Sequence, residues 1–176
     1  MRVIAGEAKS KRLVAPAGTT TRPASDRLRE SLFGMLGDRC ADARVLDLFA
    51  GSGALGIEAL SRGAREATFV ERDDAAIGAI RRNLAATGYV ERARVVRADV
   101  AAYLRRAADG FDLVFADPPY ADVALLADLL GGDDLRRLTR GVLVARTLRK
   151  HAPPVPPRWT VERERDVGED VVRFLS

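Results

Sequence analysis

The chain has 176 residues, of which 47% are hydrophobic and 31% are charged. This composition is typical of a soluble globular domain that buries about 70% of its unfolded surface. It has one cysteine and one histidine, which argues against an internal disulfide, a zinc site and a histidine-based catalytic triad, so we expect no metal. An apolar run of about 18 residues and the long apolar core of a signal peptide are both missing, so we expect a cytoplasmic protein without a membrane span.

The positive charge is concentrated at one end of the chain. Residues 1–30 account for the formal net charge of +4, because they hold seven Lys or Arg against three Asp or Glu while the rest of the chain is balanced. This distribution is typical of a protein that contacts a polyanion such as nucleic acid. A solvated basic tail is the alternative explanation.

Residues 1–20 are expected to form an N-terminal hairpin extension. Two short strands at residues 3–5 and 12–15 flank a polar turn, which is the pattern of a β-hairpin. An isolated hairpin is marginally stable, so this one must pack against the main domain or a partner. Three of its side chains are suited to phosphate contacts, namely Lys9, Lys11 and Arg12.

A helix is expected to follow, with Ser25 or Asp26 as its N-terminal cap. Apolar residues fall at helical spacing on one of its faces, namely Leu28, Leu32, Met35 and Leu36. Its other faces are expected to hold Arg27, Arg29 and Glu30.

The next stretch predicts a buried strand at residues 45–49, a glycine-rich turn and a helix that ends near residue 63. The turn has the spacing G-x-G-x-x-G with Gly51, Gly53 and Gly56. In this context of strand, turn and helix, the glycines let a nucleotide-like ligand approach the backbone. A tight turn that serves only packing is the alternative.

Two acids near this turn indicate which adenosine cofactor it holds. Glu71 ends a second strand at residues 67–70 and follows Gly51 by twenty residues, a spacing at which an acid can bind both ribose hydroxyls of an adenosine. Asp47 lies four residues before Gly51. There it would repel a pyrophosphate but could pair with the ammonium of an amino-acid moiety.

Asp99 follows a third strand, expected at residues 94–98, and precedes a helix expected at residues 100–107. It could accept a hydrogen bond from the exocyclic amine of adenine or cap that helix, and the two roles are compatible. Between the second and third strands we expect a helix at residues 73–86 that Gly88 ends.

The rest of the chain continues the alternation of strands and helices. We expect strands at residues 113–115 and 142–145, a helix at 123–130 and a final strand pair at 160–164 and 171–175. With right-handed crossovers, this order predicts an α/β fold with a mostly parallel seven-stranded sheet and helices on both faces.

The fourth strand ends abruptly in Asp117-Pro118-Pro119-Tyr120. Pro118 stops the strand because it has no N–H to donate to a sheet ladder, so Asp117 lies at the carboxyl edge, where open α/β sheets bind ligands. The Asp117 carboxylate and the Pro118 carbonyl are two acceptors, and the Tyr120 ring is a flat apolar surface. Such a set suits the exocyclic amine of a nucleobase. A rigid turn without a ligand is the alternative.

These motifs resemble the S-adenosylmethionine-dependent Rossmann-like methyltransferases that act on exocyclic amines of bases. More narrowly, segments 2–6, 21–33 and 45–56 resemble the RsmD family, bacterial enzymes that methylate N2 of a guanine in small-subunit (16S) ribosomal RNA. The resemblance implies a Rossmann-like class I methyltransferase domain at residues 21–176, with the RNA-contacting extension at residues 1–20.

The resemblance also implies roles for individual residues. The catalytic set is Asp117, Pro118 and Tyr120. The residues that bind S-adenosyl-L-methionine are Asp47, Gly51, Ser52, Gly53, Glu71, Arg72, Asp99 and Val100. The residues that contact RNA are Lys9, Lys11, Arg12, Arg22 and Arg27. The expected partner is ribosomal RNA or a small-subunit assembly intermediate, and we expect a monomer.

Three other functions stay open. An N6-adenine DNA methyltransferase would use the same four-residue motif, but the chain has no obvious further domain to read duplex DNA. A nicotinamide-dependent oxidoreductase is disfavoured by Asp47 and by the lack of a plausible His or Lys at a hydride site. An RNA-binding module without activity would leave the residues from Asp117 to Tyr120 unexplained.

Overall fold

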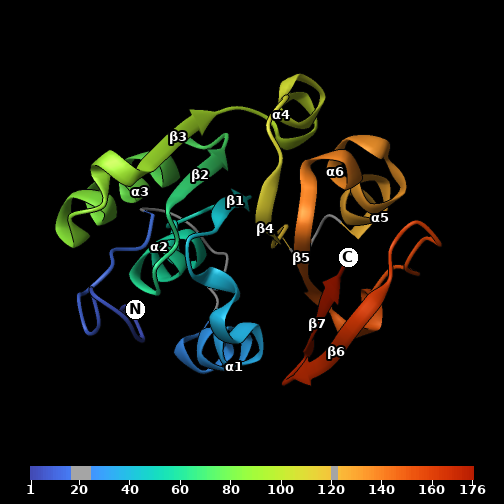
Figure 1. Cartoon of the computed structure of the whole chain (residues 1–176), viewed down its shortest axis with the longest axis horizontal. Helices are drawn as coiled ribbons and strands as arrows, with labels where there is room; N and C mark the ends of the chain where they lie inside the picture. Colours follow the sequence, from blue (N-terminus) through green and yellow to red (C-terminus); the bar gives the residue numbers. More distant parts are fainter. Residues whose placement is uncertain (17–24, 120–122) are drawn as a thin grey trace.

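The computed structural model describes residues 1–16, 25–119 and 123–176. Within these ranges the chain forms a seven-stranded sheet with the order β3-β2-β1-β4-β5-β7-β6 (Figure 1). Strands β1 to β5 are parallel, while β7 runs antiparallel to both β5 and β6. The strands are β1 Arg44–Leu48, β2 Glu66–Glu71, β3 Ala93–Arg97, β4 Phe111–Ala116, β5 Thr139–Leu148, β6 Val161–Val167 and β7 Asp170–Leu175. The predicted mostly parallel sheet is confirmed.

The helices cover both faces of this sheet. They are α1 Asp26–Leu36, α2 Ala54–Ser61, α3 Asp74–Thr87, α4 Val100–Arg106, α5 Val123–Gly131 and α6 Asp133–Leu138. Short 3-10 turns lie at η1 Gly37–Cys40, η2 Val90–Arg92 and η3 Arg149–His151. None of the helices in the described ranges combines the length and apolar character that crossing a bilayer requires.

Two apolar clusters lie on opposite faces of the sheet. One joins α1, α2 and α3 to alternate strand residues that include Val45 and Phe115, and we call this side the α2 face. The other joins α4, α5 and α6 to the intervening residues, including Leu46 and Val114, and we call it the α4 face. Since successive strand residues point to opposite faces, the parity of a position tells which face its side chain takes.

Helix α1 is confirmed as predicted, with one correction. The Ser25 hydroxyl accepts a hydrogen bond from the Leu28 amide at 3.2 Å, and the apolar stripe is buried or partly buried. Arg29, which was expected on another face than the apolar stripe, is fully buried as well. Its guanidinium donates to the Arg2 carbonyl at 2.6 Å and to an Asp26 oxygen at 2.7 Å, so the buried charge is paired and hydrogen-bonded.

The N-terminal segment folds back on itself as the predicted hairpin requires, with an antiparallel bridge between Arg2 and Arg12 and backbone hydrogen bonds from Val3 to Lys11 and from Leu13 to Met1, each at 3.0 Å. The two predicted strands do not form. The segment is nevertheless held firmly, since Val3, Ala8 and Leu13 are buried in the cluster of the α2 face. The expected boundary after residue 20 lies outside the described residues.

Two elements near the end of the chain differ from the predictions. Strand β5 has 10 residues instead of the four expected, and α6 was not predicted at all. Helix α6, Asp133–Leu138, has only six residues, and four of them are charged. Its two leucines are too few to show a helical hydrophobic periodicity.

Candidate functional site

The predicted site residues meet at the carboxyl edge of the parallel strands. Leu48 pairs with Val70 on one side and with Ala116 on the other, so the next residues of β2 and β4, Glu71 and Asp117, flank the end of β1. By the alternation of the strands, Asp47, Glu71 and Asp117 all belong to the α2 face. The sheet therefore brings three acids from three separate strands to one side of one edge.

The turn after β1 takes its shape from unusual backbone angles. Phe49 has φ +59°, Gly51 has φ +55° and Gly53 has φ +76°. All three lie in the left-handed region, which residues other than glycine rarely adopt. For Phe49 this conformation is uncommon, and sequence reasoning did not predict it. The strained residue directly follows the strand that carries Asp47.

Glu71 ties this turn to the end of β2. Its Oε2 accepts from the Gly51 amide at 2.9 Å, and its Oε1 accepts from the Arg72 and Asp73 amides at 2.8 and 3.0 Å. The carboxylate thus fixes the position of Gly51, besides any role toward a ribose.

Glycine stands at the three positions of the motif for different physical reasons. A Cβ on Gly56 would come within 2.4 Å of the Phe69 ring, and a Cβ on Gly53 would come within 3.3 Å of the same ring. Both positions therefore face the packed core between α2 and β2. A Cβ on Gly51 would meet only the Phe49 carbonyl, at 3.9 Å. Gly51 is therefore the position at which this turn leaves room for another molecule.

Asp47 is a buried carboxyl group with little to neutralise it. It is 1% exposed, and its Oδ2 accepts from the Gly56 amide at 2.9 Å. Burial raises the pKa of Asp47 well above its ordinary value; the Gly56 bond opposes this, and the negative charges of Asp117 and Glu71 add to it. An acid in such a place favours a cationic ligand, and this chemistry fits the positively charged methionine part of S-adenosylmethionine.

The remaining predicted cofactor residues surround the same edge. Asp99 is exposed and caps α4, because its Oδ1 accepts from the Ala102 amide at 3.1 Å. Its capping role is confirmed, while its contact with adenine stays a prediction. Val100 and Ser52 are buried and Arg72 is exposed. Among the described residues, no group of three or more His, Cys, Asp or Glu is placed to hold a metal ion.

Asp117 directly follows β4, as predicted, and is paired with an arginine that sequence reasoning missed. Its Oδ1 accepts from Arg146 Nε at 2.6 Å. Burial raises the pKa of Asp117, and the Arg146 charge and hydrogen bond oppose this rise. Pro118 is buried, Pro119 is exposed and Tyr120 lies outside the described residues.

Arg146 reaches Asp117 because the two residues lie side by side in the sheet. Ala116 pairs with Ala145, so the next position of β5 lies beside Asp117, and both belong to the α2 face. Arg146 is 7% exposed, and its Nη1 lies 3.7 Å from Asp170 Oδ2 at the start of β7. The signal for it was present in the sequence as a lone arginine directly after the apolar run Val142 to Ala145.

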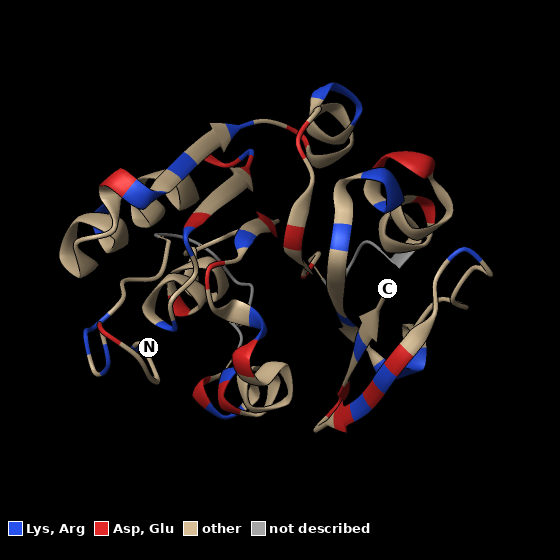
Figure 2. Cartoon of the chain, in the orientation of Figure 1, with Lys and Arg blue, Asp and Glu red and all other residues tan. Residues whose placement is uncertain are grey.

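Four of the five predicted RNA-contacting cations lie within the described residues. Lys9, Lys11, Arg12 and Arg27 are all exposed, and Arg22 lies outside the described residues. Figure 2 shows Lys and Arg at the outer end of the N-terminal segment, whereas β6 carries both signs of charge along its length. The exposure of these cations leaves them accessible to a polyanion.

Comparison with known proteins gives consistent matches along the chain. The model of the family described as "Conserved hypothetical protein 95" matches residues 1–176. The chain is 46% identical over 149 residues to the "Putative rRNA methyltransferase YlbH" of Bacillus subtilis, covering 82% of this chain and 81% of that protein. It is 36% identical over 178 residues to the "Ribosomal RNA small subunit methyltransferase D" of Escherichia coli, covering 100% of this chain and 89% of that protein.

A solved structure agrees with these sequence matches. The "Putative methyltransferase yhhF" from Escherichia coli superposes with a TM-score of 0.85 at 35% identity, over 99% of this chain and 96% of that one.

Proposed function

This chain belongs to the family described as "Conserved hypothetical protein 95", the RsmD family, and we propose that it transfers a methyl group from S-adenosyl-L-methionine to the exocyclic N2 amine of a guanine in small-subunit (16S) ribosomal RNA. Its fold is that of the Rossmann-like class I methyltransferases, and its activity is that of an rRNA methyltransferase. The methyl donor, the acceptor atom and the residue roles are the proposed part.

The observation that carries the proposal is the pair of acids at the ends of β1 and β4. Asp47 and Asp117 lie on the same face of neighbouring strands, two positions apart along the strand direction. Neighbouring parallel strands are about 4.8 Å apart, so the proposed cofactor site and the proposed amine site adjoin. Methyl transfer needs this closeness, because the reacting atoms must approach to about 3 Å.

The residues near the turn fit the cofactor by their chemistry. Asp47 would pair with its ammonium, the turn at Gly51 would border its methionine part with Ser52 and Gly53, and Glu71 with Arg72 would hold the ribose. Asp99 and Val100 would lie against the adenine. When bound, the cofactor supplies a methyl group that its positive sulfonium makes electrophilic.

The residues from Asp117 onward would hold the acceptor amine. The lone pair of an exocyclic amine is delocalised into the ring, so hydrogen bonds must favour a pyramidal nitrogen before it can attack. Because Arg146 bonds to Oδ1, we assign Oδ2 of Asp117 and the Pro118 carbonyl oxygen to the two N–H groups. Positioning of this kind corresponds to effective molarities of about 10⁵ to 10⁸ M. Tyr120 would stack on the base, an interaction worth about 1 to 3 kcal/mol.

We assign RNA binding to the exposed cations Lys9, Lys11, Arg12, Arg22 and Arg27. Phosphate contacts of this kind fix the orientation of the nucleic acid without reading its sequence. We further propose that the protein acts as a cytoplasmic monomer on ribosomal RNA or on a small-subunit assembly intermediate, with residues 1–20 as the RNA-contacting extension.

The test is methyl transfer from isotopically labelled S-adenosylmethionine to small-subunit ribosomal RNA, followed by mapping of the labelled nucleotide. The proposal expects label on N2 of a guanine, and it expects Asp117→Ala to abolish transfer while cofactor affinity stays within a few-fold. Label on N6 of adenine in DNA would identify the rival methyltransferase. A rise in melting temperature with NAD but not with S-adenosylmethionine would instead identify an oxidoreductase.

A further inference from the structure

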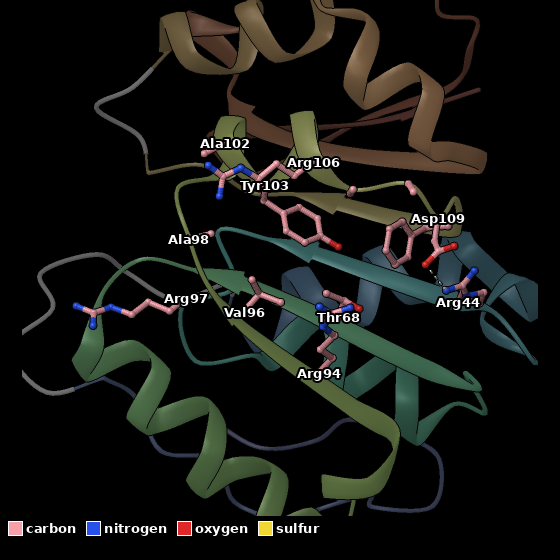
Figure 3. Close-up of a pocket in the computed structure, with 13 residues that line it drawn as sticks. Arg44, Thr68, Arg94, Val96, Arg97, Ala98, Ala102, Tyr103, Arg106 and Asp109 are labelled. Carbon is pink, nitrogen blue, oxygen red and sulfur yellow. Dashed lines mark ion pairs between the residues drawn. The ribbon is translucent and has the colours of Figure 1, made fainter.

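A second candidate binding site lies on the α4 face, away from the acids described above. It is a cavity of about 360 Å³ between α4 and the strands β2 and β3 (Figure 3). This volume lies within the range of about 300 to 1,000 Å³ that is usual for small-molecule sites. None of the described residues assigned above to the cofactor, the amine or RNA lines it.

The cavity exists because α4 is too short to cover this face. The helix has 7 residues and buries Val100 and Leu104 in the cluster of the α4 face. Beyond it, Thr68 of β2 and Val96 of β3 are only half-buried. Figure 3 shows Tyr103 extending from α4 over these strands. An aromatic ring therefore stands above a floor of sheet that no helix of the described chain fills.

The charge of the lining is strongly positive. Among the described residues, a single acid, Asp109, lines the cavity, against four arginines, Arg44, Arg94, Arg97 and Arg106. Arg44 pairs with Glu66 at 2.6 Å and lies 3.9 Å from Asp109. Arg97 has the parity of the α2 face, and its guanidinium pairs with Asp74 of α3 at 2.8 Å, so its charge does not face the cavity. Arg94 and Arg106 are exposed and form no ion pair with another described residue. Two cations are thus available to an anionic ligand.

The distance between the ends of the cavity favours a strand over a small molecule. Arg44 pairs with Glu66 in the sheet and Arg97 with Glu71. These positions are five residues apart along β2, or about 17 Å at 3.3 Å per residue. A strand of a nucleic-acid duplex carries a phosphate about every 3.4 Å of helix axis, so more than one phosphate of an extended strand fits along a cavity of this length. A free mononucleotide could reach only one end.

The cavity also begins close to the edge of the proposed reaction. Ala98 lines it and is followed directly by Asp99, which we place near the adenine of the cofactor. Strand β3 is an edge strand of the sheet. An RNA strand that leaves the carboxyl edge can therefore pass around β3 without crossing another element of the sheet.

We propose that this cavity binds a single-stranded segment of the RNA substrate, with Arg94 and Arg106 on its phosphates and the Tyr103 ring stacked on a base. The inference rests on the proposed function, since it takes RNA as the substrate. It adds a contact surface separate from the cations of the N-terminal segment and of α1.

The test compares Arg94→Gln/Arg106→Gln with a double control of the same charge, Arg81→Gln/Arg105→Gln. Arg81 lies on α3 and Arg105 lies on α4, and both are exposed and outside the cavity. The probe is a short fluorescein-labelled single-stranded RNA of mixed sequence, titrated at several salt concentrations. We expect the cavity variant to bind about 10-fold more weakly, with a salt slope smaller by about 1.4, because two phosphate contacts are lost at about 0.7 each. Equal affinity and slope in the two double variants would overturn the inference.

A second pair of variants tests the stacking. Tyr103→Phe keeps the ring and is expected to bind as the wild type does, whereas Tyr103→Leu is expected to bind at least about 5-fold more weakly. Equal binding by both would contradict a stacked base. If guanosine monophosphate competes fully with the labelled RNA in the wild type but not in the cavity variant, the site takes a free nucleotide and the inference fails.

Methyl transfer by the wild type is measured separately, so that the two proposals can fail independently. Loss of RNA affinity in the cavity variant supports the inference even if the wild type transfers no methyl group to guanine. Transfer to guanine N2 together with unchanged affinity in the cavity variant leaves the proposed function standing and removes the cavity from it.

Discussion

Arg146 donates a hydrogen bond from Nε to Oδ1 of Asp117 at 2.6 Å, so the acid at the centre of the proposed amine site is joined to a cation on the neighbouring strand. The same guanidinium lies 3.7 Å from Asp170, and it thereby links β4, β5 and β7. The pair has two consequences for Asp117. It fixes the direction of the carboxylate, and it opposes the rise in the pKa of Asp117 that burial causes.

The first prediction concerns Arg146. Removing its charge by Arg146→Met is expected to raise the pKa of Asp117 further, because burial then acts without an opposing cation. A protonated Asp117 accepts fewer hydrogen bonds, so the acid limb of the pH profile of kcat should move to higher pH. Near neutral pH, kcat should fall on the order of 10²-fold, which is the cost of a misplaced catalytic group. Arg146→Lys should restore part of the activity and shift the limb back.

The control for this prediction is Arg165→Met on β6, which removes an exposed arginine. It is expected to leave both kcat and its pH profile unchanged. A lower kcat in Arg146→Met with an unshifted acid limb would mean that Arg146 acts through folding alone, without an effect on Asp117.

A second prediction follows from the burial of Asp47. Its folded pKa lies above the unfolded value, so the folded chain favours the protonated carboxyl. This contribution to stability is present below the unfolded pKa and is lost as the pH rises through the folded pKa. Asp47→Asn stays neutral and can still accept from the Gly56 amide. Its melting temperature should therefore exceed that of the wild type by a few degrees at alkaline pH, since 1 kcal/mol moves the midpoint by about 2 to 4 °C.

The same substitution should weaken binding of S-adenosylmethionine by about 10- to 100-fold, because it removes a charged hydrogen-bond partner. Thermal scans across a pH series and titration of the cofactor check the two effects. Asp42→Asn is the control, since Asp42 has a side chain that is 83% exposed. A stability difference that grows toward acid pH would have the wrong sign and would contradict a raised pKa at Asp47.

The meeting of the three acids at one edge could be predicted from the sequence because their positions follow from local rules. Asp47, Glu71 and Asp117 come at or directly after apolar strands, and the strands of a parallel sheet end at one edge, so their meeting could be predicted from chain order. The capping roles of Ser25 and Asp99 followed from the residue types at helix starts. These predictions needed no knowledge of tertiary packing.

The failures of prediction share a different cause. The burial of Arg29 and the pairing of Arg146 both depend on partners far away in the sequence, and neither leaves a periodic pattern. Arg29 contacts Glu58 across 29 residues, and Arg146 contacts Asp117 across the same separation. The glycine motif was also only partly explained, because the Phe69 ring of β2 leaves no room for a Cβ on Gly56 and little room for one on Gly53, whose φ is +76° as well.

A third prediction tests the anchoring of the glycine turn. Glu71→Gln keeps one carbonyl oxygen but replaces the other oxygen with an NH₂ group, which cannot accept from the Gly51, Arg72 or Asp73 amides. We expect the affinity for S-adenosylmethionine to fall by about 10-fold or more, since an unsatisfied donor costs about 1 to 3 kcal/mol. Calorimetric titration of the cofactor measures this. Glu66→Gln at the other end of β2 is the matched control, and equal loss in the two variants would argue against the anchoring role.

The last prediction concerns Glu58, which holds the N-terminal segment to α2. Its two oxygens accept from the Ile4 and Ala5 amides at 2.7 and 3.0 Å, and the fully buried carboxylate also faces Arg29 at 3.5 Å. Glu58→Gln removes this charge and deprives at least one N–H group of its acceptor, while Arg29 keeps Asp26 and the Arg2 carbonyl, so we expect the free energy of unfolding to fall by about 1 to 3 kcal/mol. Urea denaturation measures it against Glu30→Gln, an exposed change on α1 that should cost less than about 0.5 kcal/mol.

Glu58→Gln should also loosen the N-terminal segment locally, because at least one of the two backbone amides loses its acceptor. Hydrogen exchange at Ile4 and Ala5 is therefore expected to accelerate more than exchange at the amides of β1. The segment carries Lys9, Lys11 and Arg12, so RNA affinity should fall in this variant although no cation is removed. Faster exchange with unchanged RNA affinity would show that the position of the segment is irrelevant to RNA binding.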